Sequence, residues 1–257
     1  MSSSSRALLF SSFAALALVG CSFDLALDGD WSRGELGRSQ WQIDDGLCPG
    51  LAGGCAFDVP LAVGASTRVH VVGVDGDTVF AEAEGSVRLG LYDVIANDPA
   101  DAFFEITAVS AGAGTLRLRD RLTGEEIDRI HVEVREATEL DCGALANNDE
   151  VLWDMPQLAP SDPIELLMPG VVASSGSSPD AQLVCRARDE RGPMLSADAI
   201  RWQVIEGADV IQLRTDALFS FSPVQGARVR YDVLQRGDAR LRVTLGDISR
   251  ELGVVVR

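Results

Sequence analysis

The cysteines are the residues of this sequence with the clearest chemistry. Four of the five lie in the body of the chain, namely Cys48, Cys55, Cys142 and Cys185. An even set of thiols in an oxidising compartment is typical of disulfides. Of the three possible pairings we favour Cys48 with Cys55 and Cys142 with Cys185, because the glycine-rich loop between the first two can reach disulfide geometry. Zinc is the competing interpretation, which the spacing and the lack of a nearby histidine disfavour.

Residues that could act as catalysts are sparse. The two histidines, His70 and His131, share their strand faces with charged residues, which is typical of plain surface. The sequence has no G-x-S-x-G, H-E-x-x-H or C-x-x-C motif and no glycine-rich phosphate loop. We therefore predict a protein that is not an enzyme. The alternative is a β-sandwich hydrolase with a carboxylate pair such as Asp98 and Asp101.

Acidic clusters raise the second alternative, a calcium-dependent adhesin. Asp24, Asp28, Gly29 and Glu35 match part of a calcium-binding loop, but Ala26 stands at one of its ligand positions. The turns at 75–77 and 97–101 could gather carboxylates, yet Asp and Asn in turns usually stabilise their own backbone. We predict no metal and no other cofactor.

The N-terminal segment predicts export. Arg6 precedes an apolar run from Ala7 to Val19, broken only by two serines. This is the layout of a signal peptide, and the run is shorter than the about 20 apolar residues of a spanning helix. The residues Leu18-Val19-Gly20-Cys21 that end it resemble the bacterial lipobox. That motif marks a signal peptide over residues 1–20.

The lipobox resemblance implies that Cys21 is acylated, with palmitate among its chains, and becomes the new N-terminus. Two or more acyl chains hold a protein stably on a membrane, so we expect a lipid-anchored protein of the cell envelope. The next residue is Ser22 rather than aspartate, which favours the outer membrane. An ordinary cleaved signal peptide with a free or paired Cys21 is the alternative. Residues 21–56 are then the lipidated cysteine and a tether that becomes ordered near Trp41.

Charge excludes several classes of partner. The net charge is −17, and all 22 basic residues are arginine because the chain contains no lysine. This acidity argues against nucleic acid as a partner and against a basic contact with anionic lipid. The absence of lysine also excludes a lysine-based phosphate loop or Schiff base.

Residues 57–137 read as one β-sandwich. Apolar and polar residues alternate at Val69 to Val71 and again at Ile130 to Val134, which predicts strands with one buried face. Further strands are expected at 78–83, 87–95, 103–109 and 115–119. Turn residues at 75–77, 97–99 and 123–125 separate them. This number of short strands over about 80 residues is typical of a sandwich.

The order of these motifs resembles the bacterial Ig-like (Big) domains. The matching segments are Pro60-Leu61-Ala62-Val63-Gly64, Ala96-Asn97-Asp98-Pro99, Ala111-Gly112-Ala113-Gly114-Thr115-Leu116 and Val132-Glu133-Val134. The resemblance implies an adhesive or spacer module without catalysis.

The pattern in residues 138–257 predicts a second Ig-like sandwich. It begins with an irregular connector at 138–160. Strands are expected at 164–168, 181–188, 200–206, 210–214, 227–233, 239–245 and 248–256. The segment Asp189-Glu190-Arg191-Gly192-Pro193-Met194-Leu195, followed by Trp202, also looks like an Ig-like module. The strand at 239–245 has no cysteine, so a bridge in this half must join the connector at Cys142 to Cys185. The sequence thus predicts two tandem sandwiches in a binding or spacer protein whose partner is an unknown protein or glycan.

Changing Cys21→Ala should release the protein into the soluble fraction, because the acyl chains on Cys21 are the expected anchor and the one apolar run is too short to span a membrane. Fractionation of envelopes with palmitate labelling measures this. A variant that stays membrane-bound and still takes up palmitate would contradict the lipid anchor.

Overall fold

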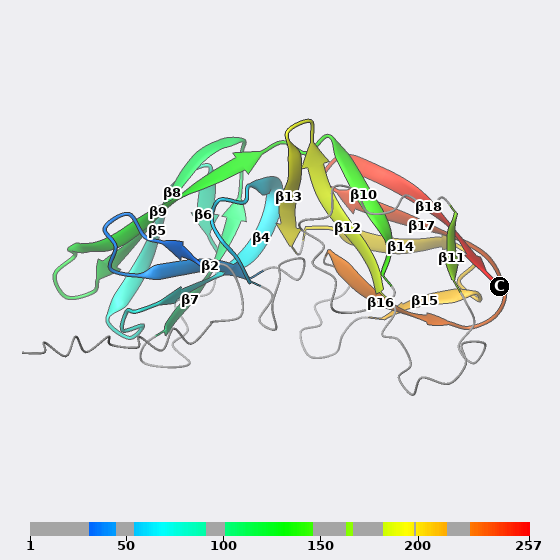
Figure 1. The fold of residues 1–257 in the computed structure, drawn as a ribbon, viewed down its shortest axis with the longest axis horizontal. Helices are drawn as coiled ribbons and strands as arrows, with labels where there is room; N and C mark the ends of the chain where they lie inside the picture. The colour runs from blue at the N-terminus through cyan, green and yellow to red at the C-terminus, as the bar shows by residue number, and fades with distance from the viewer. Residues whose placement is uncertain are drawn as a thin grey trace, which may run out of the picture.

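The computed structural model describes residues 31–44, 54–90, 101–145, 163–166, 182–197, 199–214 and 227–257, and in these ranges it is all-β. The strands form two groups that lie side by side (Figure 1). Each group encloses its own cluster of buried apolar side chains. The predicted fold class is therefore confirmed. No helix in this part of the chain is long and apolar enough to cross a membrane. The predicted signal peptide, Cys21 and Cys48 lie outside the described residues.

The first group of strands runs from β1 to β9. These strands are β1 (Ser32–Arg33), β2 (Gln40–Asp44), β3 (Gly54–Cys55), β4 (Leu61–Val72), β5 (Val79–Gly85), β6 (Val87–Leu89), β7 (Asp101–Ala108), β8 (Gly112–Asp120) and β9 (Glu126–Arg135). Their apolar residues alternate with polar ones, so one face of each strand is buried. Strands β5, β8 and β9 form one layer, and β6, β7, β4 and β2 form the other.

Strand β4 belongs to both layers. Leu61 and Ala62 pair in parallel with the end of β9, whereas residues 66–72 pair antiparallel with β7. Gly64 lies between the two parts with a φ of 85° and open space around its Cα hydrogen, which is the backbone conformation that glycine adopts without strain. The change of layer closes the first core, in which Trp41, Val69 and Leu116 are fully buried.

The second group of strands runs from β10 to β18. These strands are β10 (Glu139–Leu145), β11 (Ile164–Leu166), β12 (Gln182–Asp189), β13 (Gly192–Ala197), β14 (Arg201–Glu206), β15 (Ile211–Arg214), β16 (Arg228–Val233), β17 (Gly237–Leu245) and β18 (Ile248–Val256). One layer contains β10, β12, β16 and β15, and the other contains β11, β18, β17 and β14. Between them lies the second core, which includes Leu183, Trp202 and Leu241.

Strand β13 joins the two groups. Its first residues pair with β12, and Leu195 then pairs in parallel with Leu61 of β4. The Leu195 amide also donates to the Pro60 carbonyl at 2.9 Å. The side chains of Leu61 and Leu195 enter the first core, whereas Ala62 and Met194 enter the second. One hydrogen-bonded ladder therefore contributes side chains to both cores.

The strands differ from the sequence-based expectation at three places. The segment assigned to the tether was expected to become ordered near Trp41, and it contains not only β2 but also the short strands β1 and β3 of the first group. The predicted connector begins with β10, and the predicted turn at 189–195 contains β13. Each is short or pairs with a strand far away in the sequence, so local periodicity carries little sign of it.

Cys142 and Cys185 form the disulfide that we favoured from the sequence. The two residues face each other directly across β10 and β12, and both are buried in the second core. The bond closes a loop with a sequence separation of 43, for which the loop-entropy model gives about 4 kcal/mol. Cys55 is disulfide-bonded as well. Its pairing with Cys48 stays a prediction.

A buried carboxylate holds the β1–β2 segment on the first sandwich. Asp128 of β9 is fully buried and accepts hydrogen bonds from the backbone amides of Leu36, Arg38 and Ser39 at 2.8–2.9 Å. The Ser39 hydroxyl and the Arg129 amide donate to it as well. Burial alone raises the pKa of this carboxyl, but the hydrogen bonds outweigh burial and hold the pKa below its ordinary value.

The backbone at residue 34 passes so close to Asp128 that only glycine fits at this position. A Cβ on Gly34 would lie 2.3 Å from a carboxylate oxygen of Asp128, so any larger residue would displace one of the two. The segment and the carboxylate therefore fit each other through hydrogen bonds and through the missing side chain.

Asp128→Asn should lower the free energy of unfolding by about 2–4 kcal/mol at pH 7, because the new NH₂ group would face N–H and O–H donors in a buried site. The folded-state pKa of Asp128 is below the unfolded value of about 4. Its stabilisation is therefore complete above pH 4 and is lost as the pH falls through the folded-state pKa. Urea titrations of the unchanged protein and of Asp128→Asn, from pH 7 to pH 3, measure how far the difference between their free energies of unfolding shrinks.

Asp120→Asn is the matched control, since Asp120 accepts the amides of Leu122 and Thr123 in an exposed turn. Its loss of stability should be clearly smaller. Equal losses in the two variants would contradict the assignment of Asp128 as the buried anchor of residues 36–39.

Candidate functional site

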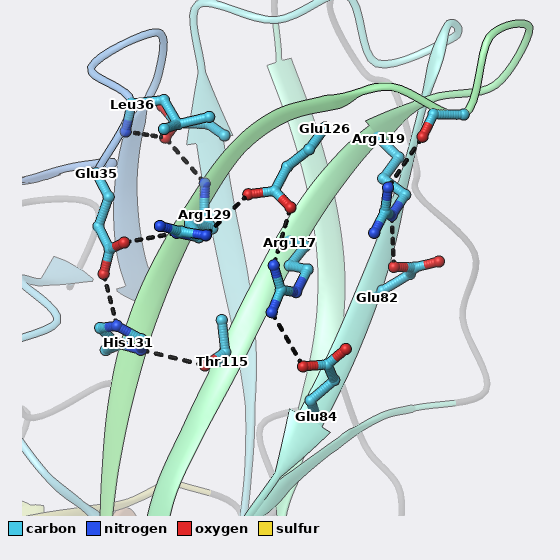
Figure 2. Close-up of polar contacts among 12 residues, drawn as sticks. Glu35, Leu36, Glu82, Glu84, Thr115, Arg117, Arg119, Glu126, Arg129 and His131 are labelled. Carbon is cyan, nitrogen blue, oxygen red and sulfur yellow. Dashed lines mark hydrogen bonds and ion pairs between the residues drawn. The ribbon is translucent and has the colours of Figure 1, made fainter.

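The outer face of β5, β8 and β9 carries a chain of ion pairs (Figure 2). Outward residues alternate along β8 and β9, and β9 has one extra residue, Ile127, opposite the Leu118–Arg119 step. This bulge returns Glu126 to the outer face. The pairs join Arg119 to Glu82 (2.6 Å), Arg117 to Glu84 (3.1 Å) and Glu126 (2.9 Å), and Arg129 to Glu126 (3.5 Å) and Glu35 (2.6 Å).

These charges neutralise one another. The hydrogen bond with Glu126, followed by the one with Glu84, raises the pKa of Arg117 above its ordinary value. Arg117, Arg119 and Arg129 each contact at least one carboxylate, and every pair is partly or largely exposed to solvent, where an ion pair contributes at most about 1 kcal/mol. The face is therefore a balanced surface with little net charge for a ligand to recognise.

His131 continues this face and has a carboxylate on one side and a hydroxyl on the other. Its Nε2 lies 2.7 Å from Glu35, and its Nδ1 lies 3.1 Å from the Thr115 hydroxyl. This is the order of groups in a hydrolase triad. The histidine side chain is 66% exposed, however, and Thr115 pairs with His131 inside the β8–β9 ladder. A hydrolase must stabilise the oxyanion of its transition state with free hydrogen-bond donors that are shielded from water. The open β8–β9 ladder beside His131 offers no such donors.

A cleft of about 930 Å³ opens beside His131, where the two groups of strands meet. The first group contributes Phe57, Asp58, residues 111–113 and residues 131–136, and the second contributes Thr138 and residues 189–191. The small residues Ala111, Gly112 and Ala113 leave the space open. The wall of the cleft is formed by the charged residues at the end of β9 and in the β12–β13 turn.

Two sets of ion pairs cross this junction. Arg135 is 7% exposed, and its Nη1 lies 3.2 Å from Asp189, which is 9% exposed. Its Nη2 donates to the Pro193 carbonyl at 3.0 Å. Arg191 is 59% exposed and reaches Glu133 at 3.0 Å. The buried pair and the strand pairing of β4 with β13 together connect the two halves.

The structure describes only some of the acidic residues chosen from the sequence, and Asp24 and Asp28 lie outside the described ranges. Asp98 lies outside the described residues. Asp101 faces His70, with 3.3 Å between Oδ2 and Nε2, and the His70 ring stacks on Phe103 at 4.1 Å between ring centres. Asp75 accepts the amide of Asp77, so this turn stabilises its own backbone. Among the residues that the structure describes, no group of three His, Cys, Asp or Glu side chains could hold a metal.

The junction residues were missed at the sequence level. Arg135 looked like the last outward residue of a strand, and Asp189 looked like part of a turn. They lie 54 positions apart in the sequence, and neither belongs to a motif. No signal in a single sequence connects them.

Comparisons with known proteins bear on the fold. Neither a protein-family model nor a curated protein matches the chain. Among solved structures, domains 5–6 of the S-layer protein SbsC are 14% identical with a TM-score of 0.29, and the match covers 77% of this chain and 93% of that one. The Yersinia pseudotuberculosis adhesin InvE is 13% identical with a TM-score of 0.30, covering 77% and 56%.

A third similar structure is a 282-residue C-terminal fragment of intimin, in complex with the intimin-binding domain of the translocated intimin receptor. It is 12% identical with a TM-score of 0.26, and the match covers 75% of this chain and 59% of that one. The chain thus spans just over half of the InvE and intimin structures. Since all three TM-scores are below 0.5, we take neither a partner nor a reaction for this chain from them.

Arg135→Met should lower the free energy of unfolding by about 3 kcal/mol, because it leaves the buried carboxylate of Asp189 without its buried partner. Arg191→Met removes the exposed contacts of Arg191 with Glu133 (3.0 Å) and with Asp189 (3.5 Å), while Arg135 still faces Asp189, so it should cost less than about 1 kcal/mol. Chemical denaturation of both variants measures the difference. Equal effects would contradict the assignment of Arg135 and Asp189 as the pair that stabilises the junction.

Proposed function

We propose that this chain is a lipid-anchored protein of the cell envelope in which two tandem Ig-like sandwiches, residues 57–137 and 138–257, form a non-catalytic binding or spacer module. Its partner is a protein or a glycan. The lipobox at Leu18 to Cys21 supports the anchor, and the outer membrane is the membrane that Ser22 favours. In this proposal the first sandwich also includes β1 to β3.

The observation that carries the proposal is the way in which the two groups of strands are joined. Successive sandwiches on an ordinary linker move independently. Here Leu61 pairs with Leu195 in one ladder, and Arg135 contacts Asp189 beside it with both side chains nine-tenths buried. A junction of this kind fixes the angle between two modules. A fixed angle is useful for holding a binding surface at a set distance from a membrane.

The charged groups support a binding or spacer role over catalysis. The hydroxyl, imidazole and carboxylate of Thr115, His131 and Glu35 lie on an open sheet face. Catalytic groups act in sites that exclude water and hold free donors toward the developing charge. The ion pairs of Figure 2 instead satisfy one another.

Photo-cross-linking on intact envelopes should capture a discrete partner. The chain has no lysine, so amine-directed cross-linkers cannot react with its side chains, and a photo-reactive amino acid is needed. Leu122 and Leu234 are suitable positions, because they are 92% and 49% exposed in the first and second halves. Buried Leu118 and Leu241 are the matched controls and should give no adduct.

Two results would overturn the proposal. The first is that neither exposed position, Leu122 or Leu234, gives an adduct. The second is turnover of ester or glycoside probes by the purified protein that Asp101→Asn or His131→Gln abolishes, since that would establish a hydrolase.

A further inference from the structure

We propose that the junction cleft binds an extended, arginine- or lysine-rich segment of a partner protein. This inference rests on the proposed function and names the chemistry of the partner. It depends on two features of the cleft: its fixed walls and its surplus of carboxylates.

The walls of the cleft are fixed before any ligand arrives. One wall is the end of β9, and the other is the β12–β13 turn, where Asp189 accepts the backbone amide of Arg191 at 2.8 Å. The Arg135 contacts with Asp189 and Pro193 connect the two walls. A preformed site avoids the cost of ordering its own residues on binding. A volume of about 930 Å³ suits several residues of an extended chain.

The cleft carries more negative than positive charge. Its two arginines, Arg135 and Arg191, already contact Asp189 and Glu133. The remaining carboxylates of the lining are Asp58, Glu136 and Glu190. None of the three has an ion pair or a side-chain hydrogen bond to the part of the chain that the structure describes. Three uncompensated carboxylates around one cleft attract a cationic partner and repel an anionic one.

The contacts across the junction hold Arg135 in place beside the cleft. This side chain is more than nine-tenths buried and lines the cleft, and its Nη1 and Nη2 are both used. Its Nε is buried and has no hydrogen-bond partner. A buried donor without an acceptor is costly. Because this Nε has no exposed surface, the contacts of an extended segment with the cleft are those of its basic side chains with the exposed carboxylates.

A second copy of this chain does not fit as the occupant. The chain has no lysine and a net charge of −17, and most arginines of the described ranges contact carboxylates of their own chain. Two such molecules repel each other at long range. The cationic segment therefore comes from a different protein.

The test measures binding of a fluorescein-labelled heptapeptide of alternating arginine and glycine to the purified full-length lipoprotein in non-ionic detergent. An acidic protein attracts any cationic peptide, so the comparison needs two variants with the same net charge. The cleft variant is Asp58→Asn with Glu136→Gln and Glu190→Gln. The control variant is Asp77→Asn with Glu125→Gln and Asp247→Asn, three exposed carboxylates outside the cleft.

We expect fluorescence anisotropy at physiological salt to show at least about tenfold weaker binding for the cleft variant and less than about twofold for the control. Equal weakening in both variants, or no binding to the unchanged protein, would overturn the inference. Circular dichroism and melting of both variants check that the fold is kept. If the peptide fails to bind while photo-cross-links still form at Leu122 or Leu234, the inference fails and the proposed function stands.

Discussion

The pairing of β4 with β13 is the constraint on which the rest of this structure depends. Alternation along a strand sends successive side chains to opposite faces. At the junction these two faces belong to two different cores, since Leu61 and Leu195 enter the first while Ala62 and Met194 enter the second. A one-residue slip of either strand would exchange leucine with alanine or methionine in both cores. The register of two short strands therefore fixes how the two halves meet.

Burial decides how much each charge contributes. The ion pairs on β5, β8 and β9 are numerous but open to solvent, so each adds little to stability. Asp128 and the Arg135–Asp189 pair are few but buried, and each makes several hydrogen bonds or contacts. Removing a partner from a buried group leaves an uncompensated charge or donor. The chain thus uses exposed pairs to balance its surface and buried ones to fix geometry.

The outer face of β5, β8 and β9 and the cleft differ in how completely their charges are paired. His131 lies at the border between them, with Glu35 on one side and the cleft residues on the other. On the face, each charge has a partner of opposite sign. In the cleft, the two arginines are occupied by the junction itself, and three carboxylates remain uncompensated. The contacts that connect the halves therefore also set the charge of the cleft between them.

Local alternation was enough to predict much of this protein. The all-β class and strands such as β5, β8, β9, β12, β17 and β18 follow from short apolar runs bounded by turn residues. The Cys142–Cys185 bond is the one favoured among three possible pairings, because the loop between Cys48 and Cys55 can close on itself. Strands β10 and β13 and the ordering of β1 to β3 did not follow, because each is defined by a partner strand rather than by its own pattern. Arg135, Asp189 and Glu190 form one site only because the chain returns to the junction after more than 50 residues. The sequence by itself determined which segments are strands, since that depends on near neighbours, and only the tertiary structure decided which charges meet, since that depends on contacts between residues far apart in the chain.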